Sequence, residues 1–285
     1  MTVEHMEQRR ILRVTRGMPT EDGAGVKLTR LIGTPEIGDI DPILMLDNFG
    51  SDDPSAYIAG FPAHPHRGFE TVSYMISGSL RHKDNKGGEG IITDGGVQWM
   101  TAGRGVVHSE MPAQTSGLMF GFQLWLNLPA KEKMREPWYR DIPSAQITQI
   151  DLGAGATAKL IVGRWNAEVG PGPERETDPF IADVALPPQG AASIPVPDGH
   201  AGFAYVFQGK AALGPGGAVQ ELGKGELGVM SAEGGLSAVA GSEGARLLIV
   251  AAKPLREPII KHGPFVMNTQ SEIRQAVSDF QRGLF

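Results

Sequence analysis

The sequence predicts an all-β protein in which one chain forms two fused β-barrels and ends in an α-helix. Three features support this prediction: short apolar runs separated by turn residues, an internal repeat, and a capped amphipathic segment near the end of the chain. Glycine and proline are frequent, with 39 and 21 residues, and they are spread along the 285 positions. That spread suits many short strands joined by turns, and the length is sufficient for two ordinary domains.

Strand-like apolar runs at short spacing fill the first half of the chain. They occupy residues 70–76, 90–93, 97–101 and 118–128, and such spacing predicts an antiparallel sandwich or barrel. Residues 130–136 could form one or two helical turns before Pro137, and residues 142–155 would connect the two halves. We therefore assign residues 1–140 to an N-terminal domain and residues 141–285 to a C-terminal domain.

The second half of the chain repeats the first. Residues 74–78 (YMISG) align with residues 205–209 (YVFQG) at an offset of 131 positions, and residues 100–102 (MTA) align with residues 230–232 (MSA) at an offset of 130. The two offsets are nearly equal, which argues against chance similarity. The repeat predicts two copies of one β unit, each with its own core.

The chain ends in a segment with the pattern of an amphipathic helix. Thr269 and Glu272 have the spacing of a capping box, in which a hydroxyl and a carboxylate bind free backbone N–H groups. Five apolar side chains then fall on one helical face: Ile273, Ala276, Val277, Phe280 and Leu284. We expect this face to pack on a barrel, because a short helix gains most of its stability from packing.

The charge and the cysteine content exclude several classes of protein. The formal net charge is −6 and no block of basic residues occurs, so we expect no direct binding of nucleic acid. No apolar run is long enough to span a bilayer or to form a secretory signal, so we expect no membrane association. The absence of cysteine excludes disulfides and thiolate metal sites, and together these features predict a cytoplasmic protein.

Two short motifs carry side chains that bind metals. His64-Pro65-His66 and His108-Ser109-Glu110 each place two ligand-type residues two positions apart, and such residues share one face of a strand. Three nitrogen donors and one carboxylate suit iron, manganese, cobalt, nickel, copper or zinc better than calcium or magnesium. Four protein ligands would leave open positions for an exogenous ligand. A single histidine in a strand is more often a surface or hydrogen-bonded residue, but the chain places two such pairs among only seven histidines.

Four stretches around and beyond these motifs carry a family resemblance. They are residues 61–74 (FPAHPHRGFETVSY), 98–112 (QWMTAGRGVVHSEMP), 41–49 (DPILMLDNF) and 263–269 (GPFVMNT). Together they resemble the pirin family of the cupin superfamily. The resemblance implies a bicupin, with two jelly-roll barrels in one chain and one divalent transition metal in the N-terminal barrel. It further implies that Fe(II) is the first choice among these metals, and that its ligands are His64, His66, His108 and Glu110.

The second barrel lacks donors at the corresponding positions. An offset of 131 places Pro195 and Pro197 opposite the first motif, and an offset of 130 places Ala238 and Ala240 opposite the second. Neither proline nor alanine has a side-chain donor. We therefore expect the C-terminal barrel to keep the scaffold without a metal site.

The remaining histidines have no paired ligand nearby in the sequence. We expect surface or structural roles for His5 in the N-terminal tail, His82 in a polar loop, and both His200 and His262 in the second half.

Other residues close to the motifs carry weaker signals. Trp99 and Met100 are expected in the core, whereas Phe61 could either line the metal cavity or pack in the core. For Arg67 we favour a structural pair with a carboxylate over contact with an anionic ligand. Gly103 and Gly105 flank Arg104 in an expected tight turn, and no phosphate-loop lysine pattern or other cofactor-binding motif accompanies them.

The resemblance implies two hypotheses for function. In the first, the protein is a quercetin 2,3-dioxygenase-like oxidoreductase, which opens a flavonol with O₂ and releases carbon monoxide. Its partners would be O₂ and a small phenolic or enolisable substrate, with Glu110 as the catalytic general base. In the second, the protein is an iron-binding redox sensor that regulates protein partners, none of which is identifiable. A sugar-phosphate isomerase of the wider cupin type ranks third, because the sequences around the motifs resemble pirins.

Overall fold

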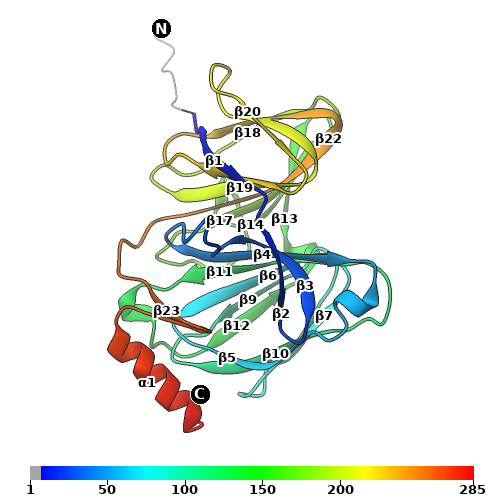
Figure 1. The fold of residues 1–285 in the computed structure, drawn as a ribbon. Coiled ribbons are helices and arrows are strands. Elements are labelled where there is room, and N and C mark those ends of the chain that lie inside the picture. Colours follow the sequence, from blue (N-terminus) through cyan, green and yellow to red (C-terminus); the bar gives the residue numbers. More distant parts are fainter. Residues whose placement is uncertain (1–7) are drawn as a thin grey trace. The chain divides into compact units, whose positions relative to one another are not determined.

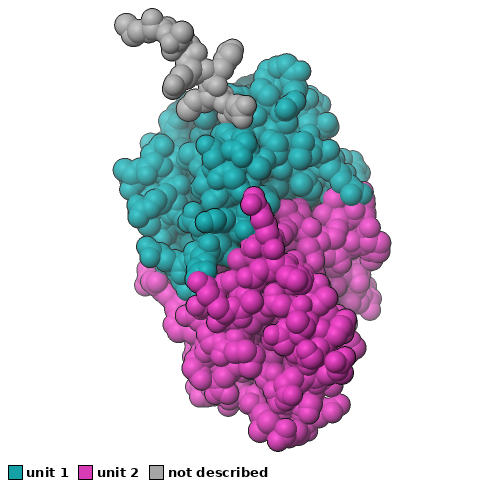
Figure 2. Space-filling view, turned by 90° about the vertical axis from the view of Figure 1, so that its left-hand side faces the viewer, with its two compact units in different colours: residues 1–17, 147–254 teal, residues 18–146, 255–285 magenta. Residues whose placement is uncertain are grey.

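A computed structural model describes residues 8–285 and confirms an all-β architecture with one α-helix near the end of the chain (Figure 1). The chain divides into two compact units, coloured teal and magenta in Figure 2. Unit 1 comprises Met1–Gly17 and Ile147–Pro254, and unit 2 comprises Met18–Gln146 and Leu255–Phe285. The expected division between residues 140 and 141 falls within a strand of unit 2, and each unit includes a segment from the opposite end of the chain.

Unit 2 contains two antiparallel sheets. The larger sheet has the order β12 (Trp138–Ile142), β9 (Val97–Thr101), β6 (Phe69–Ser77), β11 (Met119–Asn127), β4 (Ile43–Ser51), β3 (Val26–Ile32), β2 (Met18–Asp22). The smaller sheet has the order β5 (Phe61–His66), β10 (Val106–Pro112), β7 (Leu80–Asp84), β8 (Glu89–Ile92). Each expected run coincides with one strand, and both ends agree to within one residue. The runs at residues 70–76, 90–93, 97–101 and 118–128 correspond to β6, β8, β9 and β11, so these predictions are confirmed.

Unit 1 is built around one nine-stranded antiparallel sheet. Its main order is β1 (Ile11–Thr15), β21 (Glu226–Met230), β19 (Ala201–Leu213), β22 (Leu236–Ala252), β17 (Phe180–Leu186), β14 (Ala156–Val162), β13 (Thr148–Gly153). Strand β18 (Ala191–Ile194) pairs with β22, and β20 (Gln220–Gly223) pairs with β19. A separate ribbon joins β15 (Arg164–Trp165) to β16 (Glu168–Val169). The N-terminal strand β1 belongs to this sheet through β21, which explains why the start of the chain joins unit 1.

The internal repeat is visible in the strand pairing. In unit 2, β6 pairs with β9 and places Thr71 opposite Met100. In unit 1, β19 pairs with β21 and places Gly202 opposite Met230. The two pairs are separated by 131 and 130 positions, the same offsets as in the sequence alignment. The prediction of two copies of one β unit is therefore confirmed.

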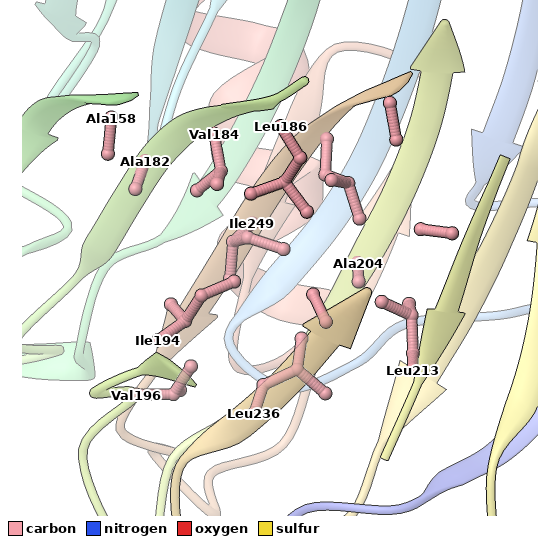
Figure 3. Packing of buried hydrophobic residues seen from close by; sticks show 14 of the residues in the cluster. Ala158, Ala182, Val184, Leu186, Ile194, Val196, Ala204, Leu213, Leu236 and Ile249 are labelled. Atoms are coloured by element: carbon pink, nitrogen blue, oxygen red, sulfur yellow. The ribbon is translucent and has the colours of Figure 1, made fainter. Parts of the chain in front are cut away.

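Apolar side chains fill the interior of unit 1. Ile194, Leu213, Leu236 and Ile249 belong to one buried cluster, seen from close by in Figure 3. Ala238 and Ala240 lie in the same cluster. Of the residues opposite the first metal motif, Pro195 and Pro197 are half-buried, while the intervening Val196 enters the core. This buried cluster contains no histidine, cysteine or carboxylate side chain.

The last segment of the chain belongs to unit 2. Strands β23 (Ile260–His262) and β24 (Phe265–Met267) form a hairpin, and α1 (Gln270–Gln281) follows. The expected capping box is confirmed: the Glu272 N–H donates to Thr269 Oγ1 at 3.2 Å, and the Thr269 N–H donates to Glu272 Oε2 at 2.8 Å.

The apolar face of α1 is shorter than expected. Ile273 and Ala276 are buried, and Val277 packs against the same cluster. Phe280 is 39% exposed, yet its ring centroid lies 6.2 Å from that of Phe265 and 5.6 Å from that of Phe285. Leu284 is 48% exposed, so the prediction was wrong for that residue. The helix ends at Gln281, and Gly283 turns the chain with a φ of +69°. Phe285 then packs into the cluster beneath the helix.

The structure has one short helical turn within residues 130–136, as expected, and the chain passes from unit 2 to unit 1 within residues 142–155. Within residues 130–136 only a short 3₁₀ helix forms, at Ala130–Glu132, and another 3₁₀ turn covers Ser144–Gln146. Residues 142–155 are not a plain linker, because β13 begins at Thr148. A third 3₁₀ turn covers Pro54–Ala56.

Among the described residues, no helix combines the length and apolar character needed to cross a membrane.

Candidate metal centre

Three histidines of unit 2 converge at the pairing of β5 and β10. His64 lies directly opposite His108, and His66 lies two residues further along β5, opposite Val106. The ring centroids are 4.5 Å apart for His64 and His108, 4.7 Å for His64 and His66, and 5.0 Å for His66 and His108. One ligand atom from each ring lies within 4.8 Å of the others, the single such group in residues 8–285. The sequence therefore predicted the residues that meet here.

The hydrogen bonding of the three rings fits a metal ion. His64 Nδ1 lies 2.7 Å from the carbonyl oxygen of Pro62, so Nδ1 donates and Nε2 keeps a free lone pair. His66 Nδ1 and His108 Nε2 are buried and have no hydrogen-bond partner among the described residues. Buried polar atoms are normally satisfied. Three imidazole nitrogens that face one another without partners form the donor set that a divalent transition metal requires.

Burial keeps the imidazoles of His66 and His108 neutral. It lowers the pKa of His108 to about 4, an effect that the Glu110 carboxylate partly opposes. Burial also lowers the pKa of His66 well below its ordinary value, and the neighbouring His108 and His64 rings lower it further. A neutral imidazole offers the lone pair that a metal binds. The two buried rings are therefore ready to act as ligands at neutral pH.

The metal-free protein is expected to lose stability on mild acidification. Between a pH of about 4 and about 6.5 the unfolded chain binds more protons at His108 than the folded chain, so the free energy of unfolding falls as the pH is lowered. Urea unfolding of the metal-free wild type and of His108→Asn at pH 7 and pH 4.5 measures this. The wild type should lose more stability than the variant, by roughly 1–3 kcal/mol. Equal losses would contradict the lowered pKa.

Glu110 lies in the same region but outside the histidine group. The residue is buried on β10, on the same side as His108, and a register irregularity separates the two residues in the pairing with β5. Its carboxylate accepts hydrogen bonds from Ser73 Oγ at 2.8 Å and from Gln123 Nε2 at 2.7 Å. Both carboxylate oxygens are therefore held by donors from the opposite sheet.

Sequence reasoning missed Ser73 and Gln123. They face each other across β6 and β11, and each is a polar residue with apolar or aromatic residues on both sides in the sequence. A polar side chain on the inner face of a buried strand requires a buried partner, which is the signal that could have identified them. The structure shows that their partner is Glu110.

A cavity of about 630 Å³ opens beside the histidines. Its size lies within the usual range for small-molecule sites. Phe61 lines this cavity together with His64, His66 and Glu110, and it also packs against a core cluster, so both alternatives for this residue hold. The remaining walls are formed mostly by apolar side chains: Leu28, Leu44, Met45, Phe49 and Trp125. Trp99 and Met100 are buried in the core, as expected, and neither lines the cavity.

Residues of the last segment contact the chain that directly follows β5. Arg67 Nη1 donates to Asp279 on α1 at 2.8 Å, and its guanidinium lies 4.4 Å from the ring of Phe285. The expected structural pair of Arg67 with a carboxylate is thus confirmed. Lys133 Nζ is buried and donates to three oxygens, those of Gly68, Asn127 and Val266, at 2.7, 2.6 and 3.0 Å.

The glycines around Arg104 form the expected turn. Gly103 and Gly105 have φ values of +50° and +138°, which favour glycine. A Cβ at Gly105 would lie 2.7 Å from the ring of Phe285, so the turn also provides room for the end of the chain.

The other described histidines have structural or surface positions. His82 was expected in a polar loop, but the structure places it on β7, where it is buried. Its Nε2 lies 2.9 Å from Asp141 Oδ2. His200 is buried, and its ring nitrogens contact backbone carbonyls of Asp178 and Asp198. His262 is exposed at the end of β23. His5 lies outside the described residues.

Comparison with known proteins places these features in a family. Residues 25–126 match the family model described as Pirin, and residues 181–285 match the one described as the Pirin C-terminal cupin domain. The two matches agree with the tandem cupin fold.

Individual relatives resemble the chain along almost its whole length. A Pseudomonas aeruginosa protein whose name assigns it provisionally to the quercetin 2,3-dioxygenases is 45% identical over 97% of this chain and 98% of its own length. A pirin-like protein of Caulobacter vibrioides is 46% identical over 98% of this chain and 100% of its own. The crystal structure of a quercetin 2,3-dioxygenase from Acinetobacter baumannii matches with a TM-score of 0.89 and 32% identity, covering 98% of both chains.

Proposed function

Because this chain belongs to the pirin family, we propose that it is a metal-dependent dioxygenase that opens a flavonol such as quercetin with O₂. The observation that carries the proposal is the group of three converging histidines beside a cavity that Glu110 also lines. Relatives named as quercetin 2,3-dioxygenases support the same reaction class.

We propose His64, His66 and His108 as metal ligands, with Glu110 as the fourth. The proposed metal is Fe(II), and manganese, cobalt, nickel, copper or zinc would also suit nitrogen and carboxylate donors. Once bound, such a metal would acidify a coordinated hydroxyl group and supply the electronic pathway for reaction with O₂. The nitrogen atoms without partners on His66 and His108 support this assignment.

Glu110 is the proposed general base once its carboxylate is released from the metal. A base must come within hydrogen-bonding reach of the proton that it removes, and Glu110 lines the cavity in which the substrate would lie. Ser73 and Gln123 hold its two oxygens and thereby fix the direction in which the carboxylate accepts a proton. A flavonol 3-hydroxyl would lose its proton to this carboxylate, and the apolar walls would exclude water from the anion that forms.

The test is an assay of quercetin with metal-loaded and metal-free protein under O₂. Metal-dependent loss of the flavonol absorbance with release of carbon monoxide would support the dioxygenase. A fully iron-loaded protein that leaves quercetin and related phenols unchanged would contradict it and favour the redox-sensing hypothesis. The expected cytoplasmic location stays a prediction, which fractionation of the producing cell would test.

A further inference from the structure

A row of polar side chains crosses the wall of the cavity in unit 2. Arg30 on β3 lies opposite Asp47 on β4, and Asp47 lies opposite Gln123 on β11. Directly opposed residues of an antiparallel pair share a face of the sheet, and all three side chains line the cavity. Because Gln123 binds Glu110, the row extends from the proposed base to Arg30. Arg30 lies two strands from Gln123, roughly 10 Å away at ordinary strand spacing.

The guanidinium of Arg30 is fixed in place with one edge unused. Its Nε and Nη2 donate to the two carboxylate oxygens of Asp47 at 2.8 and 2.6 Å, and Nη2 also donates to Asp22 at 2.9 Å. Nη1 has no hydrogen-bond partner within residues 8–285. The hydrogen bond to Asp47 is the main cause that raises the pKa of Arg30, so the group stays charged. Its free N–H groups are therefore held in one position on the cavity wall. Because the side chain is already ordered, binding a ligand costs it little conformational entropy.

Asp22 adds an acceptor beside these donors. One of its oxygens accepts from the Gly23 N–H at 2.7 Å, the other accepts from Arg30, and the side chain is 52% exposed. A carboxylate can accept about four hydrogen bonds, so Asp22 retains capacity for a ligand. Arg30 thus presents N–H donors beside an acceptor oxygen of Asp22. A hydroxyl group both donates and accepts, so it matches this pair.

We propose that Arg30 and Asp22 determine specificity by binding hydroxyl groups on the end of an aromatic substrate that lies away from the three histidines. The substrate class is then a planar polyphenol, with apolar faces against Phe49, Phe61 and Trp125 and hydroxyl groups along one edge. This inference rests on the proposed function, because it concerns the orientation of a flavonol in the same cavity.

The experiment compares the binding of two flavonols in the absence of O₂. Quercetin carries hydroxyl groups on both of its outer rings, whereas 3-hydroxyflavone keeps only the 3-hydroxyl and the adjacent ketone that would face the metal. Affinities are measured by calorimetry with zinc-loaded protein, so that no turnover is required. We expect the wild type to bind quercetin at least about tenfold more tightly, which corresponds to about 1.4 kcal/mol.

Arg30→Lys keeps the positive charge next to Asp47 but removes the free edge of the guanidinium. We expect it to weaken quercetin binding about tenfold and to leave 3-hydroxyflavone binding within about twofold. The chain offers a matched control in Arg246→Lys. Arg246 binds both oxygens of Asp183 at 2.9 and 2.6 Å, with similar exposure, in the unit that lacks the histidine group. This control should not change the affinity for either flavonol.

Asp22→Asn is the second variant, and it keeps the inference testable if Arg30→Lys does not fold. The side chain of Asp22 is exposed, so we expect this substitution to be tolerated. We expect it to reduce quercetin affinity selectively as well. Equal affinities of the wild type for both flavonols, or equal losses for both in the variants, would overturn the inference. The two failures are distinguishable: selective binding without turnover under O₂ would contradict only the dioxygenase, and turnover without selective binding would contradict only the role of Arg30 and Asp22.

Discussion

Replacing His108 by alanine is expected to abolish stoichiometric metal binding. The substitution removes one of three nitrogen donors whose ligand atoms lie within 4.8 Å of one another. Two imidazoles on one strand would remain, with Glu110 held by Ser73 and Gln123. Metal analysis after anaerobic loading with Fe(II) and gel filtration measures the effect. The wild type should retain one ion per chain, and the variant should retain only background metal.

The matched control for this prediction is His262→Ala. His262 also lies in unit 2, but its side chain is exposed at the end of β23 and belongs to no ligand group. This variant should retain the metal content of the wild type. Circular dichroism would verify that His108→Ala remains folded. A folded His108→Ala protein that still holds one ion per chain would disprove the proposed centre.

Replacing Glu110 by glutamine should lower the rate of flavonol consumption by a factor of about 10²–10⁴, the usual contribution of a general base. Glutamine keeps the size of the side chain, and its carbonyl can still accept from Ser73. The amide cannot take up the proton of a substrate hydroxyl. Initial rates of quercetin loss under O₂, divided by the metal content of each preparation, separate the loss of the base from any loss of metal.

Glu70→Gln provides the comparison for Glu110→Gln. Both glutamates are 1% exposed in unit 2, but Glu70 accepts a hydrogen bond from Thr101 at 2.6 Å and does not line the cavity. The Glu70 variant should retain its rate per bound metal to within a few-fold. Glu110→Gln with the wild-type rate per metal would mean that another group removes the proton.

Local sequence patterns predicted most of the architecture. The short spacing of apolar runs between turn residues identified β6, β9 and β11, because such runs are typical of strands in an antiparallel barrel. The capping box at Thr269 identified the start of α1, because its two hydrogen bonds involve residues only three positions apart. The three histidines were also predictable, since each pair lies within a single strand and shares its face.

Contacts between distant residues could not be predicted in the same way. Arg67 and Asp279 are 212 positions apart, and no periodic pattern links them. Ser73 and Gln123 meet Glu110 only because two sheets face each other across the interior of unit 2. The exposure of Leu284 was mispredicted because helical periodicity assumes a continuing helix, whereas α1 ends at Gln281 and Gly283 turns the chain with a positive φ.

Unit 2 is assembled from two segments that are far apart in the chain, and this affects its folding during biosynthesis. A ribosome adds residues from the N-terminus, and domains generally fold in that order as they emerge. Here the strands that carry His64, His66 and His108 are translated early, yet Lys133 meets Val266, and Arg67 meets Asp279, only after the final segment has been made. The larger part of unit 2 is therefore translated before the larger part of unit 1, yet unit 2 is completed last. A nascent chain stopped before Gly263 would contain every candidate ligand but lack the residues that contact the chain directly after the strand on which two of them lie.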